Sequence, residues 1–194
     1  MLASKIESEE ANLLVRSRAG DTAAFGRLVE LYADRVVTVC ARMVRDRGVA
    51  EDLAQEAFVK AWQSLAGFDG RSTFYTWLYR IAVNLCLSER RRPRRVVGAI
   101  DDGVMGRAES AVARPDEAAE MREEHGLILT ALAELDEEHR AVVVLRDIEG
   151  LDYGEIAGIL GVARGTVKSR LHRGRMALRE RLRVQGSEGP KGQG

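Results

Sequence analysis

The chain has 194 residues, a formal net charge of +0, 45% hydrophobic residues and 31% charged residues, a composition typical of a globular protein. Its apolar runs fall far short of the roughly 20 residues that cross a bilayer, and its first residues carry charge instead of an apolar signal core. We therefore expect a cytoplasmic protein with no membrane insertion.

The residue types that build active sites and metal sites are sparse and scattered. Cys40 and Cys86 have no Cys or His at metal-ligand spacing and fall at or beside apolar helical stripes, so we expect two buried free thiols. The histidines stand far apart, at positions 125, 139 and 172. Because the usual phosphate-binding, hydrolase and metalloprotease motifs are absent, the sequence predicts no catalytic residue, no metal, no cofactor and no enzyme activity.

The neutral average hides a segregated charge. Five of the six residues at 90–95 are arginine, and residues 162–183 hold eight Lys or Arg against a single acid. Between these blocks, residues 96–124 hold eight acids and three arginines. Two basic blocks joined by an acidic connector indicate a nucleic-acid partner.

Apolar residues recur at helical spacing through most of the chain, whereas no strand pattern stands out. In the N-terminal half the expected elements are a helix over 21–44 that Asp21 caps, a helix over 49–65, a turn over 67–72 and a helix from Phe74 that ends at Pro93. After a gap the period returns at Leu127, and Asp136 is expected to cap a helix that stops at Gly150. The sequence thus predicts an all-α protein with two small helical domains over 1–95 and 125–184, a flexible acidic linker over 96–124 and a disordered tail over 185–194.

Residues 153–171 are predicted to form a helix-turn-helix, in which Gly161 takes the positive φ of the turn. The exposed face of the second helix offers cationic, hydroxyl and imidazole side chains that suit the major groove of DNA and its phosphates. These candidate duplex contacts are Arg164, Thr166, Lys168, Ser169, His172, Arg173 and Arg175. The alternative is a solvated basic helix without a DNA role.

Two features of the N-terminal half are candidates for further contacts. Seven of the ten aromatic residues lie within 58–79, and Tyr75 and Tyr79 fall off the apolar stripe, on a face with Arg80 and Asn84. Exposed aromatics among cationic and amide groups stack unpaired bases, although core packing remains the alternative.

The helix over 49–65 also has a polar face with Asp52, Gln55 and Glu56. This face is either a solvated surface or an acidic docking surface for a basic protein partner.

The chain resembles the sigma-70 family in two stretches. Residues 52–62 (DLAQEAFVKAW) and 68–84 (FDGRSTFYTWLYRIAVN) resemble regions 2.2 to 2.4, and residues 135–182 resemble region 4. The match is nearest to the extracytoplasmic-function branch, group 4, of the envelope-stress sigma-E type. The resemblance implies an alternative sigma factor that binds core RNA polymerase, recognises −35 and −10 promoter elements and promotes strand opening.

The resemblance also implies a role for each group of residues. Asp52, Gln55 and Glu56 would dock on the clamp helices of the largest polymerase subunit, with the flap of the second largest as a further contact. The −35 element of promoter DNA would be read by the seven helix-turn-helix residues named above. The contacts to the −10 element and its melted strand would be Phe68, Asp69, Gly70, Arg71, Ser72, Thr73, Tyr75, Tyr79, Arg80 and Asn84. An anti-sigma factor is a further expected partner.

The resemblance leaves several residues and two alternative functions to be decided. The resemblance places Trp77 on the melting surface, whereas the helical period places it in the core. Asp136 stands where the family usually has Pro, and Gly154, Gly158 and Gly174 stand where helix formers are usual. The alternative function is a polymerase-independent helix-turn-helix regulator. A nucleic-acid enzyme would need paired carboxylates or metal ligands among the DNA-facing residues, and none is found there.

Overall fold

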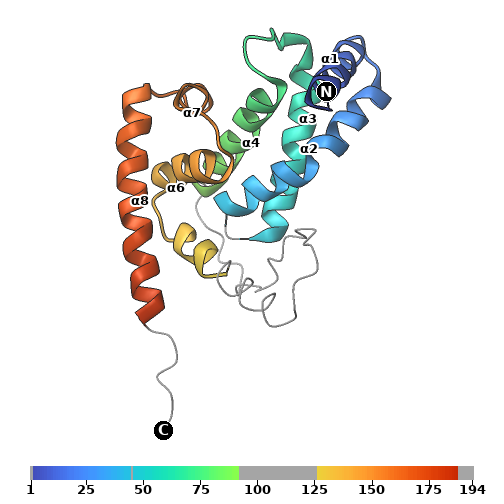
Figure 1. Cartoon of the computed structure of the whole chain (residues 1–194). Helices are drawn as coiled ribbons and strands as arrows, with labels where there is room; N and C mark the ends of the chain where they lie inside the picture. The colour runs from blue at the N-terminus through green and yellow to red at the C-terminus, as the bar shows by residue number, and fades with distance from the viewer. Residues whose placement is uncertain (1, 45, 92–125, 188–194) are drawn as a thin grey trace.

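The computed structural model describes residues 2–44, 46–91 and 126–187 (Figure 1), and every regular element within them is a helix, which confirms the all-α prediction. The N-terminal elements are α1 (Leu2–Arg18), α2 (Thr22–Met43), α3 (Arg47–Ser64), the 3-10 turn η1 (Leu65–Gly67) and α4 (Phe74–Arg91). The C-terminal elements are a helical segment over 126–133, α6 (Glu137–Val143), the π-helical turn η2 (Val144–Ile148), α7 (Tyr153–Leu160) and α8 (Arg164–Ser187).

The N-terminal half is built on α2, α3 and α4, which pack against one another. As predicted, the Asp21 carboxylate caps α2 by accepting the backbone N–H of Ala24 at 2.9 Å. Asp46 caps α3 in the same way. Cys40 and Cys86 are fully buried free thiols between these helices, which confirms their prediction.

Helix α1 is an element that the sequence analysis missed. It packs on α2, where its Leu13 is buried and its Glu10 carboxylate accepts the Tyr32 hydroxyl at 2.7 Å. The apolar stripe of α1 is short, because polar and charged residues fill most of its first three turns. The periodicity that predicts the other helices is therefore weak here.

The C-terminal half contains the predicted helix-turn-helix in α7 and α8. A capping box between Asp152 and Glu155 begins α7, and Gly161 ends it with a φ of 65°. Two expectations were wrong. The Asp136 side chain makes no capping hydrogen bond to α6, and α8 continues to Ser187, past the start of the predicted tail. The predicted linker and the rest of the tail lie outside the described residues.

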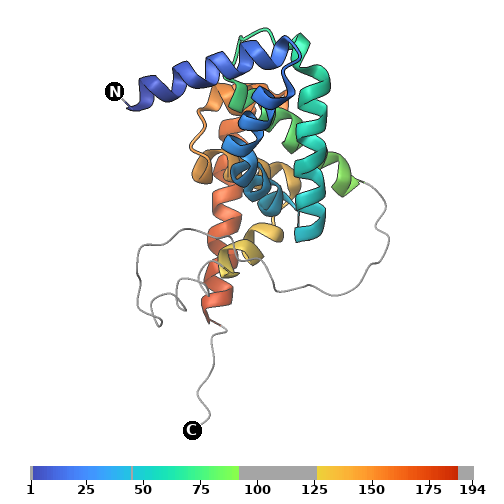
Figure 2. The same cartoon turned by 90° about the vertical axis from the view of Figure 1, so that its right-hand side faces the viewer.

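The two halves share one hydrophobic core, so they lie against each other instead of standing apart. Figure 1 shows α4 between α3 on one side and α7 on the other, with α8 at the outer edge of the molecule, and in the turned view of Figure 2 α8 lies behind the other helices. Arg140 on α6 is only 1% exposed, and its guanidinium donates to the Met43 carbonyl at the end of α2 at 2.8 Å. The same guanidinium donates to the carbonyls of Leu132, Ala133 and Leu135.

Gly174 lies where α8 crosses α6 at close range. A Cβ at this position would stand 2.9 Å from Val143 Cγ2 and 3.1 Å from the His139 carbonyl oxygen, so a side chain must push the helices apart. We expect Gly174→Ala to lower the free energy of unfolding by about 1–3 kcal/mol in urea denaturation, since overpacking outweighs the helix propensity of Ala.

The control is Gly158→Ala on α7, where the added Cβ meets nothing within 4 Å. This variant is expected to raise the free energy of unfolding by about 0.4–1 kcal/mol. Equal stabilisation by both substitutions would show that α6 and α8 do not approach as closely as described.

Candidate nucleic-acid and polymerase interface

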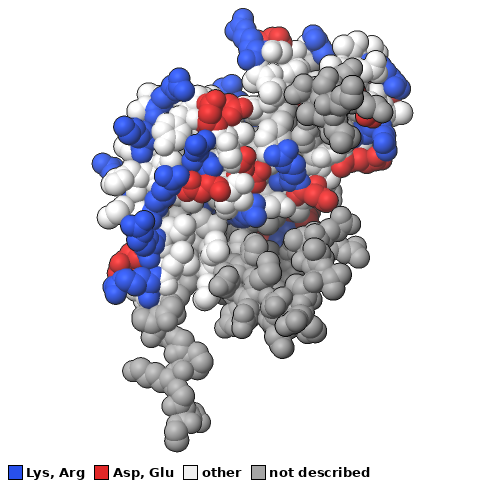
Figure 3. All heavy atoms as spheres, viewed as in Figure 1, with Lys and Arg blue, Asp and Glu red and all other residues white. Residues whose placement is uncertain are grey.

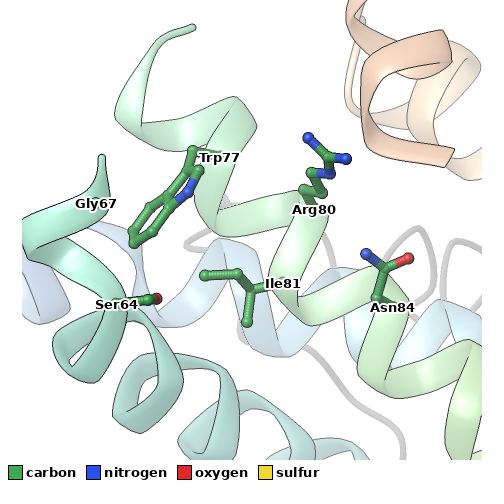
Figure 4. A pocket seen from close by; sticks show the side chains of 6 residues that line it. All are labelled: Ser64, Gly67, Trp77, Arg80, Ile81 and Asn84. Carbon is green, nitrogen blue, oxygen red and sulfur yellow. The ribbon is translucent and has the colours of Figure 1, made fainter. Parts of the chain in front are cut away.

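A cavity of about 370 Å³ opens between the end of α3 and one face of α4 (Figure 4). Ser64 at the end of α3 and Gly67 at the end of η1 form one side, and four α4 residues face them: Trp77, Arg80, Ile81 and Asn84. The cavity therefore combines an indole ring, an aliphatic side chain, a guanidinium and a carboxamide. Groups of these kinds are able to stack on a planar ring and to hydrogen-bond its polar edge, and the volume falls within the range of small-molecule sites.

Trp77 belongs both to this cavity and to the core beside it. Its ring packs on Phe68, with centroids 5.2 Å apart, and on Phe74, with centroids 5.8 Å apart, while it also lines the cavity. The core interpretation of Trp77 is therefore confirmed in part, and its place on the melting surface stays a prediction. Phe68 is 7% exposed, so it supports the cavity wall from behind instead of offering a free face.

The turn between η1 and α4 is exposed and held by its own polar groups. The Asp69 carboxylate accepts the backbone N–H of Arg71 at 3.1 Å and pairs with its guanidinium at 3.0 Å. Gly70 takes a φ of 73°, and the Thr73 hydroxyl oxygen accepts the backbone N–H of Thr76 at the start of α4. Residues 69–73, Ser72 included, are all exposed. In the chain they lie between Gly67 on one side of the cavity and Trp77 on the other.

The predicted aromatic face of Tyr75, Tyr79, Arg80 and Asn84 was wrong in its geometry. Arg80 and Asn84 are exposed at the cavity, whereas Tyr79 is 0% exposed and Tyr75 is half-buried on the side of α4 that faces α2 and the C-terminal half. The reason is that both tyrosine hydroxyls bind a partner far away in the sequence. The DNA contacts of the two tyrosines remain a prediction.

The partners of both tyrosines meet at one carboxylate. Glu149 accepts the hydroxyl of Tyr79 at 2.6 Å and that of Tyr75 at 2.9 Å. Arg42 Nη1 lies 3.3 Å and Arg35 Nη2 4.0 Å from the same carboxylate, and we call these five residues the Glu149 cluster. Burial, together with the acceptor on Glu149, raises the pKa of both tyrosines, so their hydroxyls remain protonated donors.

The basic face of α8 is exposed on the outer surface, where Figure 3 shows Lys and Arg side chains gathered along this helix. Six of the seven predicted duplex contacts are exposed on it, namely Arg164, Lys168, Ser169, His172, Arg173 and Arg175, and Thr166 is half-buried. Arg175 is held by two hydrogen bonds to the Asp147 carboxylate. Met176, 57% exposed on the same helix, is a candidate contact that the sequence analysis missed.

The polar face of α3 is exposed as expected, with Asp52, Gln55 and Glu56 all open to solvent. Val59 follows on the same face and is 55% exposed, which sequence analysis did not note. A partly exposed aliphatic side chain among acids and amides is typical of a protein-docking surface, since interfaces pair an apolar centre with a polar rim.

Residues 2–44, 46–91 and 126–187 offer neither a metal site nor a membrane span. No group of three or more His, Cys, Asp or Glu there is placed to hold a metal ion. None of the helices in these ranges combines the length and the apolar character needed to span a bilayer.

Comparison with known proteins decides the family. The model of sigma-70 region 2 matches residues 28–96, and that of sigma-70 region 4 matches residues 125–178. The ECF RNA polymerase sigma factor SigW of Bacillus subtilis is 36% identical over 182 residues, 86% of this chain and 92% of that protein. The chain belongs to the sigma-70 family, in its extracytoplasmic-function branch. The ECF RNA polymerase sigma-E factor of Escherichia coli is 38% identical over 173 residues, 86% of this chain and 90% of that protein.

Two solved structures share this fold, and one of them is a sigma factor. CnrH, in complex with the cytosolic domain of CnrY, matches with a TM-score of 0.67 and 26% identity over 91% of this chain and 98% of its own. The sigma factor RpoE of Bartonella quintana, in complex with the anti-sigma factor NepR, matches with a TM-score of 0.67 and 26% identity over 82% of this chain and 97% of its own. The family match favours a sigma factor over a polymerase-independent helix-turn-helix regulator.

By the residues that these two models match, α3, the cavity and α4 belong to region 2, and α7 and α8 belong to region 4. The region 2 match begins at Leu28, inside α2, so α1 precedes it. The candidate surfaces therefore divide between the two regions: the cavity and the acidic α3 face on region 2, and the basic α8 face on region 4.

Proposed function

We propose that this sigma factor binds core RNA polymerase and directs promoter-specific initiation, reading the −35 element with α8 and the −10 element with the cavity of region 2. The observation that carries the proposal is the pair of separate DNA-type surfaces on one chain. One is a basic helix shaped for a major groove, and the other is a cavity sized for a single base.

The cavity suits a base flipped out of the non-template strand. Trp77 supplies a ring for stacking, while Arg80 and Asn84 supply donors and an acceptor for the edge of the base. Stacking returns about 1–3 kcal/mol per base, which offsets the few kcal/mol needed to unstack it. The exposed turn at 69–73 is the neighbouring surface for the displaced strand.

The α8 face suits the edges of a duplex. Lys168 and Arg173 bond the acceptor edge of guanine, and Ser169 and His172 make shorter contacts. Arg164 and Thr166 lie at the start of the helix, where backbone N–H groups favour a phosphate. Met176 offers an apolar contact for a thymine methyl group.

The exposed α3 face suits the clamp helices of the largest polymerase subunit, and the flap of the second largest is a further proposed contact. Asp52 and Glu56 provide the charge that attracts a basic partner, and Val59 provides an apolar centre. A specificity subunit of this kind performs no chemistry itself. It acts where the polymerase does, in the cytoplasm.

An anti-sigma factor is part of the proposal. The sigma factor RpoE of Bartonella quintana, one of the two similar structures named above, is in complex with the anti-sigma factor NepR. Its likeness extends over 82% of this chain, which supports an anti-sigma factor as a partner here.

Transcription from a template library tests the proposal. The templates carry randomised −35 and −10 windows, and core RNA polymerase transcribes them with and without the chain. We expect chain-dependent transcripts that start at a fixed distance from two enriched motifs. Transcripts that are the same with and without the chain would refute the sigma-factor function.

Substitution of Arg173 tests the −35 contact. Arg173→Ala is expected to weaken binding of holoenzyme to the enriched −35 sequence by about 1–3 kcal/mol, the worth of one good base contact. Arg175→Ala is expected to cost less, because the Arg175 guanidinium is already bonded to Asp147. Fluorescence anisotropy on the selected promoter measures both, and an unchanged affinity for Arg173→Ala would contradict its assigned role.

A further inference from the structure

An acid that precedes the helix-turn-helix holds one arginine of α8. The Asp147 carboxylate on η2 accepts hydrogen bonds from Nε and Nη2 of Arg175, the first at 2.9 Å. These bonds raise the pKa of the Arg175 guanidinium, so the group remains a cation. A carboxylate that accepts two parallel N–H groups fixes the plane of the guanidinium as well as its place.

Arg164 is held against the first turn of α7. A Cβ at Gly154 would stand 3.6 Å from Cζ and 3.6 Å from Nη2 of Arg164, so the guanidinium lies directly over this glycine. The backbone N–H groups of Glu155 and Gly154 lower the pKa of the Asp152 carboxyl, and the nearby charge of Arg164 lowers it further. Gly154, which stands where the family usually has a helix former, therefore leaves space for the Arg164 guanidinium.

These two arginines, which we call the flank pair, lie on one side of α8 and away from its proposed base contacts. At about 100° per residue, the four proposed base contacts spread over about 140° of the helix surface: Lys168, Ser169, His172 and Arg173. Arg164 and Arg175 lie about 20° apart, beyond the Lys168 edge of this arc and about 90–110° from its centre. Along the helix axis they are about 16 Å apart. When the centre of the arc enters the major groove, such a flank faces the backbone of one strand.

The bonds to Asp147 limit what Arg175 offers to DNA. A guanidinium carries five N–H donors in a planar fork, and Asp147 accepts two of them along one edge. The donors that remain are both N–H groups of Nη1 and one of Nη2, at the end of a side chain that is 50% exposed. This end suits the oxygens of a phosphate, which accept a pair of parallel N–H groups.

We propose that Asp147 and Gly154 are positioning residues, which hold the flank pair ready to bind two phosphates of one strand beside the −35 element. The inference rests on the proposed −35 contact of α8. The flank pair sets the register of α8 in the groove, whereas the base contacts set the sequence that is read. Arg164 and Arg175 therefore contribute an affinity that is the same for every sequence.

The salt dependence of DNA binding tests the flank pair. Holoenzyme is bound to the selected promoter, and to the same promoter with a scrambled −35 element, between about 50 and 200 mM salt. Arg164→Ala and Arg175→Ala are each expected to reduce the slope of log K against log salt concentration by about 0.9, the effect of one phosphate. Both are expected to weaken the two promoters by the same factor, whereas Arg173→Ala weakens mainly the selected one. A flank variant that weakens only the selected promoter, or that keeps the full slope, would overturn the assignment.

The sign of one substitution tests the positioning role of Asp147. Asp147→Asn removes a negative charge beside DNA, so charge alone predicts tighter binding. Positioning predicts binding that is weaker by about two- to tenfold, the cost of immobilising one long side chain, because a carboxamide accepts through one oxygen only. In the Arg175→Ala background the same substitution is expected to weaken nothing.

Glu138→Gln is the matched control for Asp147→Asn. It removes the same charge from an ion pair with Arg170, on a different side of α8, and is expected not to weaken binding. Tighter binding by Asp147→Asn, or equal weakening with and without the Arg175 side chain, would overturn the positioning role.

Gly154→Gln tests the other member of the flank pair. The added side chain takes the space of the Arg164 guanidinium, so the variant is expected to lose the same part of the salt slope as Arg164→Ala. The two substitutions combined are expected to lose no more than either alone. Gly158→Gln on the same helix is the control and keeps the slope, since nothing lies within 4 Å of a Cβ there. A full slope for Gly154→Gln would overturn the role of this glycine.

Failure of the sigma-factor function has a different signature. The library then yields no promoter with any variant, the unaltered chain included. The salt slope of the free chain on non-specific duplex DNA still decides whether Arg164 and Arg175 each bind a phosphate. Equal slopes for the unaltered chain and both alanine variants would overturn the flank pair independently of the function.

Discussion

Arg140→Met is expected to lower the free energy of unfolding by about 3–5 kcal/mol, the largest stability effect of any single substitution considered for this chain. Arg140 is 1% exposed, and its guanidinium donates to the carbonyls of Leu132, Ala133, Leu135 and Met43. These carbonyls lie at or near the ends of two helices, and the hydrogen bonds to Leu132, Leu135 and Met43 are buried. Methionine fills much of the volume but removes every hydrogen bond that the guanidinium donates to these carbonyls.

Arg140→Lys separates charge from geometry. A lysine keeps the positive charge but lacks the planar fork that reaches four carbonyls at once, so we expect it to recover only a minor part of the loss. The exposed Arg179→Met on α8 is the control and is expected to change stability by no more than about 0.5 kcal/mol. Urea denaturation measures all three, and a loss below about 1 kcal/mol for Arg140→Met would contradict the structural role of this residue.

The double variant Asp52→Arg/Glu56→Arg is expected to abolish binding to core RNA polymerase while leaving stability within about 1 kcal/mol of the unaltered chain. Both carboxylates are exposed on the face of α3 that also carries the exposed Val59. Reversing two charges places cations against a basic partner, and juxtaposed like charges across an interface cost several kcal/mol. Co-elution with core polymerase in size-exclusion chromatography measures the loss.

The matched control for this face is Glu30→Arg/Asp34→Arg on α2. These two acids are also exposed and four residues apart, so the change in net charge and the helical spacing are the same. This control is expected to retain polymerase binding. Normal holoenzyme assembly by the α3 double variant, or equal loss in both double variants, would refute a specific docking role for the α3 face.

Local signals predict the helices well in this chain. Helix caps and apolar stripes depend on residues close together in the chain, so they are recognisable in the sequence. This holds for the caps at Asp21 and Gly161 and for the apolar stripes of α2, α3 and α4. Helix α1 lacks such a stripe, and its position depends on packing against α2. The continuation of α8 to Ser187 likewise overrides the Gly-rich composition from which a disordered tail was predicted.

The site is predicted in part, and the missing parts depend on distant partners. The α8 face and the acidic α3 face follow from helical spacing alone, as do Arg80 and Asn84 at the cavity. The burial of Tyr79 does not, because its hydroxyl is bonded to Glu149, 70 residues away. Ser64 and Gly67 were also missed, since they reach the cavity from the end of the preceding helix.

The most direct measurement of the central claim is permanganate reactivity of thymines in a promoter selected from the library, with core polymerase and the unaltered chain. The account predicts reactive, unpaired thymines at the −10 element only when both proteins are present. A complex that assembles on the same promoter and leaves every thymine unreactive would contradict it.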